Sequence, residues 1–244
     1  MRKRCRPEPS SNKTTLLNKI SRYEIATGIA ILFHLIGIIG MLYFDRDFFV
    51  RSTPFNLLLM FALLCWTQGQ LNRYFLLFLL LAFSIGVLLE IAGVNTALIF
   101  GEYSYGKVLG YQLARVPLII GINWFIIIYC IGISIHTLLM KALSRLPVEE
   151  NKKPPVLKAV SVIVDGATLA VFFDWVMEPV AVKLGYWEWK GNDGVPFFNY
   201  FCWFGVSLLL LALFHFLPFS KSNKFAVNLL LIQMMFFLLL RTFL

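Results

Sequence analysis

Long stretches of apolar residues recur along the whole chain and set its predicted architecture. A helix that crosses a bilayer needs about 20 mostly apolar residues. Stretches of this kind predict seven transmembrane helices, at residues 25–44, 55–66, 74–93, 117–140, 157–180, 200–217 and 225–244. The second stretch is the weakest of the seven, because it is much shorter than the length that a span requires.

Composition supports the membrane class. Hydrophobic residues make up 59% of the 244 residues and charged residues only 14%, whereas a soluble domain carries about 25% charged residues. The four cysteines include no Cys-x-x-Cys pair, so neither a disulfide framework nor a zinc knuckle is predicted. We therefore expect an all-α polytopic membrane protein, with a basic tail at residues 1–24 and a single transmembrane helical domain at residues 25–244.

The basic residues predict how the chain is oriented. Fifteen Lys and Arg residues fall on the side of the N-terminal tail and seven on the opposite side. Cytoplasmic loops carry the excess of positive charge, so the N-terminus is predicted to be cytoplasmic in a multi-pass protein of the cell (inner) membrane. The net charge of +9 then reflects attraction to membrane lipids. No nucleic-acid partner is expected.

Four acidic residues fall inside predicted spans: Glu90, Asp165, Asp174 and Glu178. A carboxylate at the centre of a span costs about 2.5–3.5 kcal/mol, and such residues usually face the bundle interior and carry function. Asp174 and Glu178 lie four residues apart and share one helix face, and Pro179 is expected to disfavour regular helix beyond them. With Glu90 they reach the same depth, which predicts a shared polar site. For Asp165, a hydrogen bond to a neighbouring helix is an equally good explanation.

The loops that follow the third and fifth spans resemble each other. In both, aromatic residues alternate at period two, as on one face of an extended segment, and a Val-Pro pair then leads into the next span. The offset is 84 residues between Tyr103 and Trp187 and 79 between Pro117 and Pro196. This predicts a parallel internal repeat of spans 3–4 and 5–6. An interfacial belt is the simpler explanation for isolated aromatic residues.

Two matched copies, each after a buried carboxylate, instead favour a pseudo-symmetric pocket. Its floor would be carboxyl groups and its walls aromatic rings, with asparagine amides as hydrogen-bonding groups. The predicted substrate-binding residues are Tyr103, Tyr105, Asn123, Trp124, Trp187, Trp189, Asn199 and Trp203.

Missing motifs narrow the chemistry of this pocket. The three histidines lie in three different spans, and the chain contains neither a Gly-x-Gly nor a Gly-x-Ser-x-Gly sequence. No cofactor and no metal site are therefore expected. Acids and aromatic rings suit the protonation of an alkene, because a buried neutral carboxylic acid can donate a proton and ring faces stabilise the resulting carbocation. A second carboxylate could activate water or remove a different proton. The substrate would be an apolar polyene dissolved in the bilayer.

At these residues the chain resembles the integral-membrane carotenoid hydratases, the group containing γ-carotenoid 1',2'-hydratase and bisanhydrobacterioruberin hydratase. The resemblance covers roughly residues 90–203, and Glu178 stands where many members carry Asp. The matching residues are Gly101, Tyr103, Tyr105, Leu109, Gly110, Val116, Pro117 and Trp124, then Asp174, Glu178, Pro179, Gly185, Tyr186, Trp187, Trp189, Val195, Pro196 and Asn199.

The resemblance implies a cofactor-independent hydro-lyase that adds water across the terminal C1=C2 bond of a carotenoid of the lycopene or γ-carotene type. Other enzymes of carotenoid biosynthesis are then possible partners. We expect Asp174 to be the acid, since it lies about 6 Å deeper than Glu178, and Glu178 or Glu90 to be the base. The alternatives are a carotenoid cyclase that uses the same cation, a proton-coupled transporter, and a carotenoid-binding protein without catalysis.

Overall fold

The computed structural model describes residues 21–145, 155–191 and 194–244, and it confirms the predicted all-α polytopic membrane architecture. Residues 1–20, most of the predicted basic tail, lie outside the described residues. Within the described ranges, six helical segments are long and apolar enough to cross a membrane. These are α1 (Arg22–Tyr43), α4 (Arg73–Thr96), α5 (Ile119–Leu143), the segment Lys158–Lys183, α8 (Phe197–Phe216) and α9 (Lys224–Phe243).

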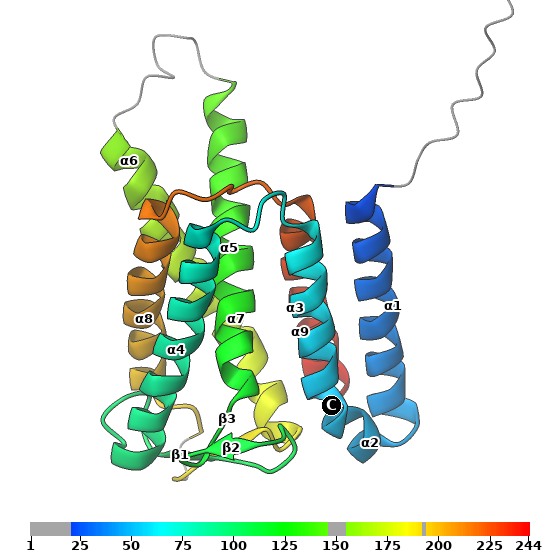
Figure 1. Ribbon diagram of the computed structural model, residues 1–244. Coiled ribbons are helices and arrows are strands. Elements are labelled where there is room, and N and C mark those ends of the chain that lie inside the picture. Colours follow the sequence, from blue (N-terminus) through cyan, green and yellow to red (C-terminus); the bar gives the residue numbers. More distant parts are fainter. Residues whose placement is uncertain (1–20, 146–154, 192–193) are drawn as a thin grey trace, which may run out of the picture.

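The second predicted span is a shorter helix, α3 (Thr53–Thr67), preceded by the short helix α2 (Arg46–Arg51). Its 15 residues correspond to about 22 Å, less than the roughly 30 Å of a hydrocarbon core. Nevertheless α3 runs between the same two ends of the bundle as its neighbours, so successive long helices alternate in direction (Figure 1). The start of α1 and the C-terminus consequently lie at opposite ends. Which end faces the cytoplasm stays a prediction.

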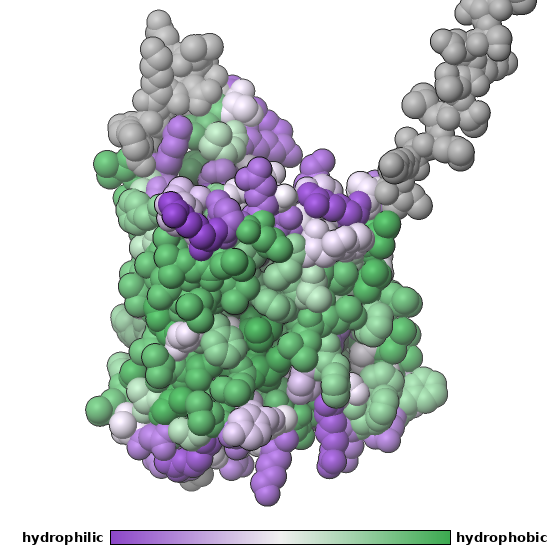
Figure 2. All heavy atoms as spheres, viewed as in Figure 1, coloured by the Kyte–Doolittle hydropathy of each residue, from purple (hydrophilic) through white to green (hydrophobic). Residues whose placement is uncertain are grey.

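The flanks of the bundle are apolar. Figure 2 shows hydrophobic side chains covering the visible side between two polar ends. Large apolar side chains on α1 and α4 stand exposed, among them Leu32 at 54% and Leu80 at 58%. An apolar surface of this extent is typical of contact with lipid.

Helix α5 forms the centre of the bundle and contacts α3, α4, α7, α8 and α9. Its residues from Trp124 to Ser134 are buried on every side. Neighbouring side chains approach its glycines closely: a Cβ at Gly121 would lie 2.5 Å from the Phe83 ring. The first turns of α5 are therefore held rigidly, and they carry Asn123 and Trp124.

The extended segments predicted from the alternating aromatics form a two-stranded antiparallel ribbon of β1 (Tyr103–Tyr105) and β4 (Trp187–Trp189). A second, shorter pair joins β2 (Gln112–Leu113) to β3 (Val116–Pro117). Both pairs lie at the end of the bundle where the C-terminus lies, below α4 and α5 in Figure 1. We call this end the ribbon end.

The ribbon also confirms the parallel internal repeat. Ser104 pairs with Glu188 at the centre of the ribbon, and these residues are separated by the 84 positions that relate the two copies. The same offset matches Glu90 with Asp174 and Gly101 with Gly185. Both glycines have positive φ, at +118° and +71°, a conformation that favours glycine. α4 and α7 run in the same direction (Figure 1).

The segment Lys158–Lys183 is not one regular helix. It comprises the end of α6 (Pro155–Val160), the π-helical turn η1 (Ser161–Asp165) and α7 (Gly166–Lys183). The expected break after Glu178 is wrong, because α7 continues past Pro179 to Lys183. Proline has no N–H to donate to the carbonyl four residues earlier, which belongs to Trp175. Arg241 of α9 donates to that carbonyl instead, over 3.0 Å, and its guanidinium lies 4.2 Å from the Trp175 ring centroid.

This contact predicts an energetic coupling between residues 179 and 241. Arg241→Leu should lower the free energy of unfolding by about 1 kcal/mol, because the Trp175 carbonyl loses its donor. In a Pro179→Ala background the loss should be smaller, since the alanine N–H restores the helical hydrogen bond. Denaturant unfolding of the four purified variants in detergent measures the coupling, and an equal loss in both backgrounds would contradict it.

Candidate active site

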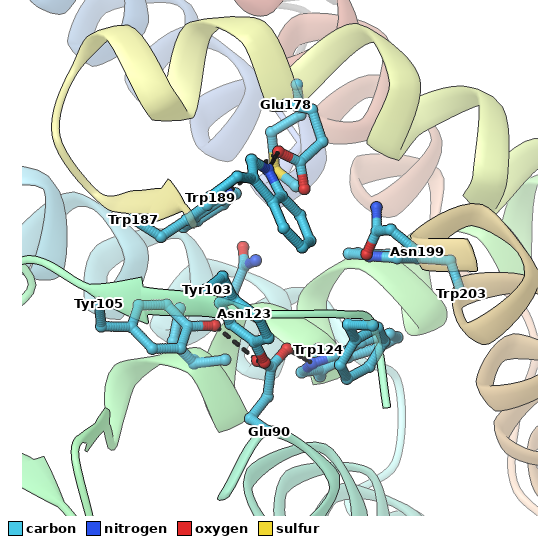
Figure 3. Close-up of a pocket in the computed structure, with 13 residues that line it drawn as sticks. Glu90, Tyr103, Tyr105, Asn123, Trp124, Glu178, Trp187, Trp189, Asn199 and Trp203 are labelled. Atoms are coloured by element: carbon cyan, nitrogen blue, oxygen red, sulfur yellow. Dashed lines mark hydrogen bonds between the residues drawn. The ribbon is translucent and has the colours of Figure 1, made fainter. Parts of the chain in front are cut away.

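A small chamber lies at the ribbon end, enclosed by α4, α5, α7, α8 and the β1–β4 ribbon (Figure 3). Its free volume is about 30 Å³, enough for a water molecule. Every predicted site residue except Asp174 lines it, together with three residues that sequence reasoning missed. The lining residues are Glu90, Phe100, Tyr103, Tyr105, Ile120, Asn123, Trp124, Met177, Glu178, Trp187, Trp189, Asn199 and Trp203.

The three missed residues are all apolar. Phe100 and Met177 each immediately precede a motif residue, Gly101 and Glu178, and Ile120 lies one turn before Trp124. Their apolar side chains carry no chemical signal that separates them from the other core residues of the spans. Only their adjacency to the motif residues could have indicated them.

Glu90 is the most fully hydrogen-bonded acid of the chamber. Tyr103 and Tyr105 donate their hydroxyls to its Oε2 over 2.5 and 2.7 Å, and the Trp124 indole Nε1 donates to Oε1 over 3.0 Å. Burial, and secondarily the nearby Glu90, raise the pKa of the Tyr103 and Tyr105 hydroxyls well above the usual value. Both tyrosines therefore remain protonated donors, and three donors together stabilise a carboxylate at Glu90.

Glu178 faces Glu90 across the chamber (Figure 3). The indole groups of Trp187 and Trp189 both donate to its Oε2, over 3.0 and 3.1 Å. Its other oxygen, Oε1, accepts no hydrogen bond from the described residues. The two carboxyl groups are therefore held differently: Glu90 has donors on both oxygens, and Glu178 has donors on one.

Asp174 lies behind the chamber wall. It is fully buried, and its Oδ2 accepts a hydrogen bond of 2.8 Å from the Asn199 amide. Its Oδ1 is buried without a partner among the described residues. Asp174 thus does not line the chamber but is hydrogen-bonded to Asn199, which does.

Asp165 does not join the other three acids. It is exposed, lies in the η1 turn, and accepts a hydrogen bond of 2.5 Å from the Ser161 hydroxyl of the same segment. The hydrogen bond to a neighbouring helix that we considered for it is therefore not present among the described residues.

Aromatic rings from both repeat copies pack against one another around the acids. Trp124 and Trp203, related by the 79-residue offset, stack with their ring centroids 4.3 Å apart. Tyr103 packs 5.2 Å from Trp189 across the ribbon. Trp124 and Tyr103 are only 2% and 5% exposed, whereas the residues of an interfacial belt face the headgroups. The belt explanation is therefore wrong for these residues.

The chamber combines two carboxyl groups, seven aromatic side chains and two amides, and among the described residues no basic side chain lines it. Across residues 21–145, 155–191 and 194–244, no group of three or more His, Cys, Asp or Glu side chains could hold a metal ion. The arrangement can hold a proton on one carboxyl, bind a water molecule at the other, and stabilise a cation against ring faces.

A family model described as "Carotenoid biosynthesis protein" matches residues 52–244. The match begins just before α3 and includes every residue that lines the chamber. No curated protein and no solved structure matches the chain.

The stacked tryptophans allow a matched test of the hydrogen bond to Glu90. Trp124→Phe should lower the free energy of unfolding by about 1–3 kcal/mol more than Trp203→Phe, because only the first change leaves the buried Glu90 Oε1 without its donor. The indole of Trp203 makes no hydrogen bond to the described residues, so its replacement reports the loss of packing alone. Thermal and denaturant unfolding in detergent measure both, and equal losses would contradict the prediction.

Proposed function

Since the chain belongs to the carotenoid biosynthesis protein family, we propose that it adds water across the terminal C1=C2 double bond of an acyclic carotenoid end group. One observation carries the proposal. Glu90 and Glu178, from two helices of the internal repeat, face each other across an aromatic chamber with room for water.

We assign proton donation to Glu178. Its Oε2 is occupied by two indole donors and its Oε1 is not, so Oε1 is the oxygen that can carry a proton toward a substrate. Transfer of this proton to C2 uses the π electrons of the double bond and leaves a tertiary cation at C1. The substrate must enter with its terminal double bond between the two acids.

The aromatic walls stabilise the cation. A desolvated cation over an indole or phenol face gains up to about 2 kcal/mol from each ring. Tyr103, Tyr105, Trp124, Trp187, Trp189 and Trp203 surround the chamber. Because these rings are fixed by mutual packing, they need no reorganisation when the charge develops.

Glu90 is the base of the proposed reaction. Its three donors favour the carboxylate form, and a water bound to it can attack C1 while the proton of that water passes to Glu90. The product is a tertiary 1-hydroxy carotenoid. Glu178 is then deprotonated and Glu90 protonated, and return of the proton across the chamber completes the cycle without a cofactor.

Asp174 has a positioning role in this proposal, in place of the acid role expected from its depth. Its hydrogen bond orients the amide of Asn199 toward the chamber.

A cyclase would use the same cation but would have no use for the water that the chamber can hold. A carotenoid-binding protein or a transporter would not depend on two acids at one end of the bundle.

Expression of the chain in a cell that makes lycopene or γ-carotene tests the reaction directly. We expect a product 18 Da heavier than the substrate, with a tertiary hydroxyl at C1. A new ring-containing product of unchanged mass would establish the cyclase instead. Unaltered pigment at wild-type expression levels would contradict both enzymes.

Variants in the same cells test the roles of the acids. Glu178→Gln and Glu90→Gln should each lower product formation at least about 100-fold, since each removes acid–base catalysis. Asp174→Asn should lower it less than about tenfold, because asparagine keeps the shape and an acceptor for Asn199; complete loss would instead indicate direct proton transfer by Asp174. The control is Glu188→Gln, which changes an exposed acid between Trp187 and Trp189 and should leave product formation unchanged.

A further inference from the structure

A second and much larger cavity borders the chamber. Its free volume is about 300 Å³, against about 30 Å³ for the chamber, and it falls in the size range of ligand cavities, roughly 300–1,000 Å³. It lies between α1, α2, α3 and α9, and reaches α5 at Asn123. Of these elements, only α5 also encloses the chamber.

The two cavities meet at Asn123 and at the start of β4. Asn123 lines both of them. Tyr186 lines the large cavity, and the next residue, Trp187, lines the chamber. The Tyr186 hydroxyl is held by Thr53 of α3 through a hydrogen bond of 2.7 Å. Asn123, Tyr186 and Trp187 therefore mark the place where the large cavity and the chamber adjoin.

The large cavity opens on the apolar flank of the bundle. Residues at its rim stand exposed, with Phe33 and Ile36 at 46%, Phe48 at 62% and Phe55 at 75%. Deeper lining residues such as His34 and Gln233 are only 5% exposed. The wall is mostly apolar, and its phenylalanines are Phe33, Phe48, Phe49, Phe55, Phe236 and Phe237.

We propose that this cavity binds the polyene chain of the substrate and admits it from the bilayer, with Asn123 marking the passage to the acids. The inference rests on the proposed function. The chamber has room for about one water molecule and is too small for a carotenoid, so the polyene chain needs an adjoining apolar volume. An opening on the flank lets the chain pass from lipid to the site without entering water.

The large cavity has few polar groups, as expected for a site that binds an apolar ligand. The His34 Nδ1 is hydrogen-bonded to the Ala30 carbonyl over 2.7 Å, and Thr53 is paired with Tyr186. Asn56 and Gln233 each keep one buried oxygen without a partner among the described residues. A mostly apolar wall with a small number of polar groups is typical of sites that bind hydrophobic molecules.

Two glycines of α1 provide a matched test. Gly37 lines the cavity, and a Cβ there would lie 3.5 Å from the Phe236 ring, an ordinary contact. Gly28 has nothing within 4 Å of its Cβ position and lines none of the three described cavities. Gly37→Leu therefore fills the cavity, and Gly28→Leu makes the same change on the same helix outside it.

A second pair changes the mouth instead of the interior. Ile36 lines the mouth, and Ile39, similarly exposed at 48%, does not line the cavity. Ile36→Trp should narrow the opening, and Ile39→Trp is its control. This pair keeps the test decisive if Gly37→Leu fails to fold, which a thermal unfolding scan in detergent detects.

The primary readout is pigment bound, measured without turnover. Each variant is combined with Glu178→Gln, expressed in lycopene-producing cells and purified, and the carotenoid per mole of protein is measured by absorbance. We expect at least about fivefold less pigment with Gly37→Leu or Ile36→Trp, and less than a twofold change with the controls. Equal pigment in filled and control variants overturns the proposal, as does mass spectrometry that finds only phospholipid displaced by Gly37→Leu.

The second readout is product formation by the same variants with Glu178 intact. It separates the two proposals, because pigment binding does not require the reaction. Cavity-dependent pigment binding without any hydroxylated product would contradict hydration and leave the cavity assignment standing. Hydroxylated product together with pigment binding that does not depend on the cavity would contradict the cavity assignment and leave hydration standing.

Discussion

Carboxyl groups inside an apolar bundle need hydrogen-bond donors, and the rest of this site depends on how the chain supplies them. In an extended strand, every second side chain points to the same face. Tyr103 and Tyr105 of β1 therefore both reach Glu90, and Trp187 and Trp189 of β4 both reach Glu178. Pairing of the two strands brings the donors and the acids of both repeat copies to one place.

The two copies of the internal repeat share a backbone arrangement but differ in where their acidic residues lie. The 84-residue offset matches Glu90 with Asp174, yet Glu90 lines the chamber and Asp174 lies behind it. Glu178 occupies the position that matches Val94 in the first copy. One carboxyl group of the chamber, Glu90, thus lies at a position that is acidic in both copies. The other, Glu178, lies at a position that is acidic only in the second copy. In the proposed reaction, this asymmetry allows one acid to donate a proton and the other to accept one.

The bilayer is the natural source of an apolar substrate for such a site. The acids lie near one end of the bundle, whereas the neighbouring cavity opens on the apolar flank. A long polyene can then remain in an apolar environment along most of its length while its end group reaches the acids. The water that the proposed reaction consumes has to reach only the small chamber at the ribbon end.

The sequence by itself determined the spans, the parallel repeat, the alternating aromatic ribbons and all but one of the polar and aromatic residues that converge on the chamber. These features are local or periodic, so apolar length, a period of two and a fixed offset reveal them. Tertiary structure decided what depends on contacts between distant segments. Asn199 on α8 pairs with Asp174 behind the chamber wall, and Arg241 on α9 supplies a donor where α7 continues past Pro179. The large cavity likewise forms only where α1, α3 and α9 meet, because no single stretch of sequence contains its wall.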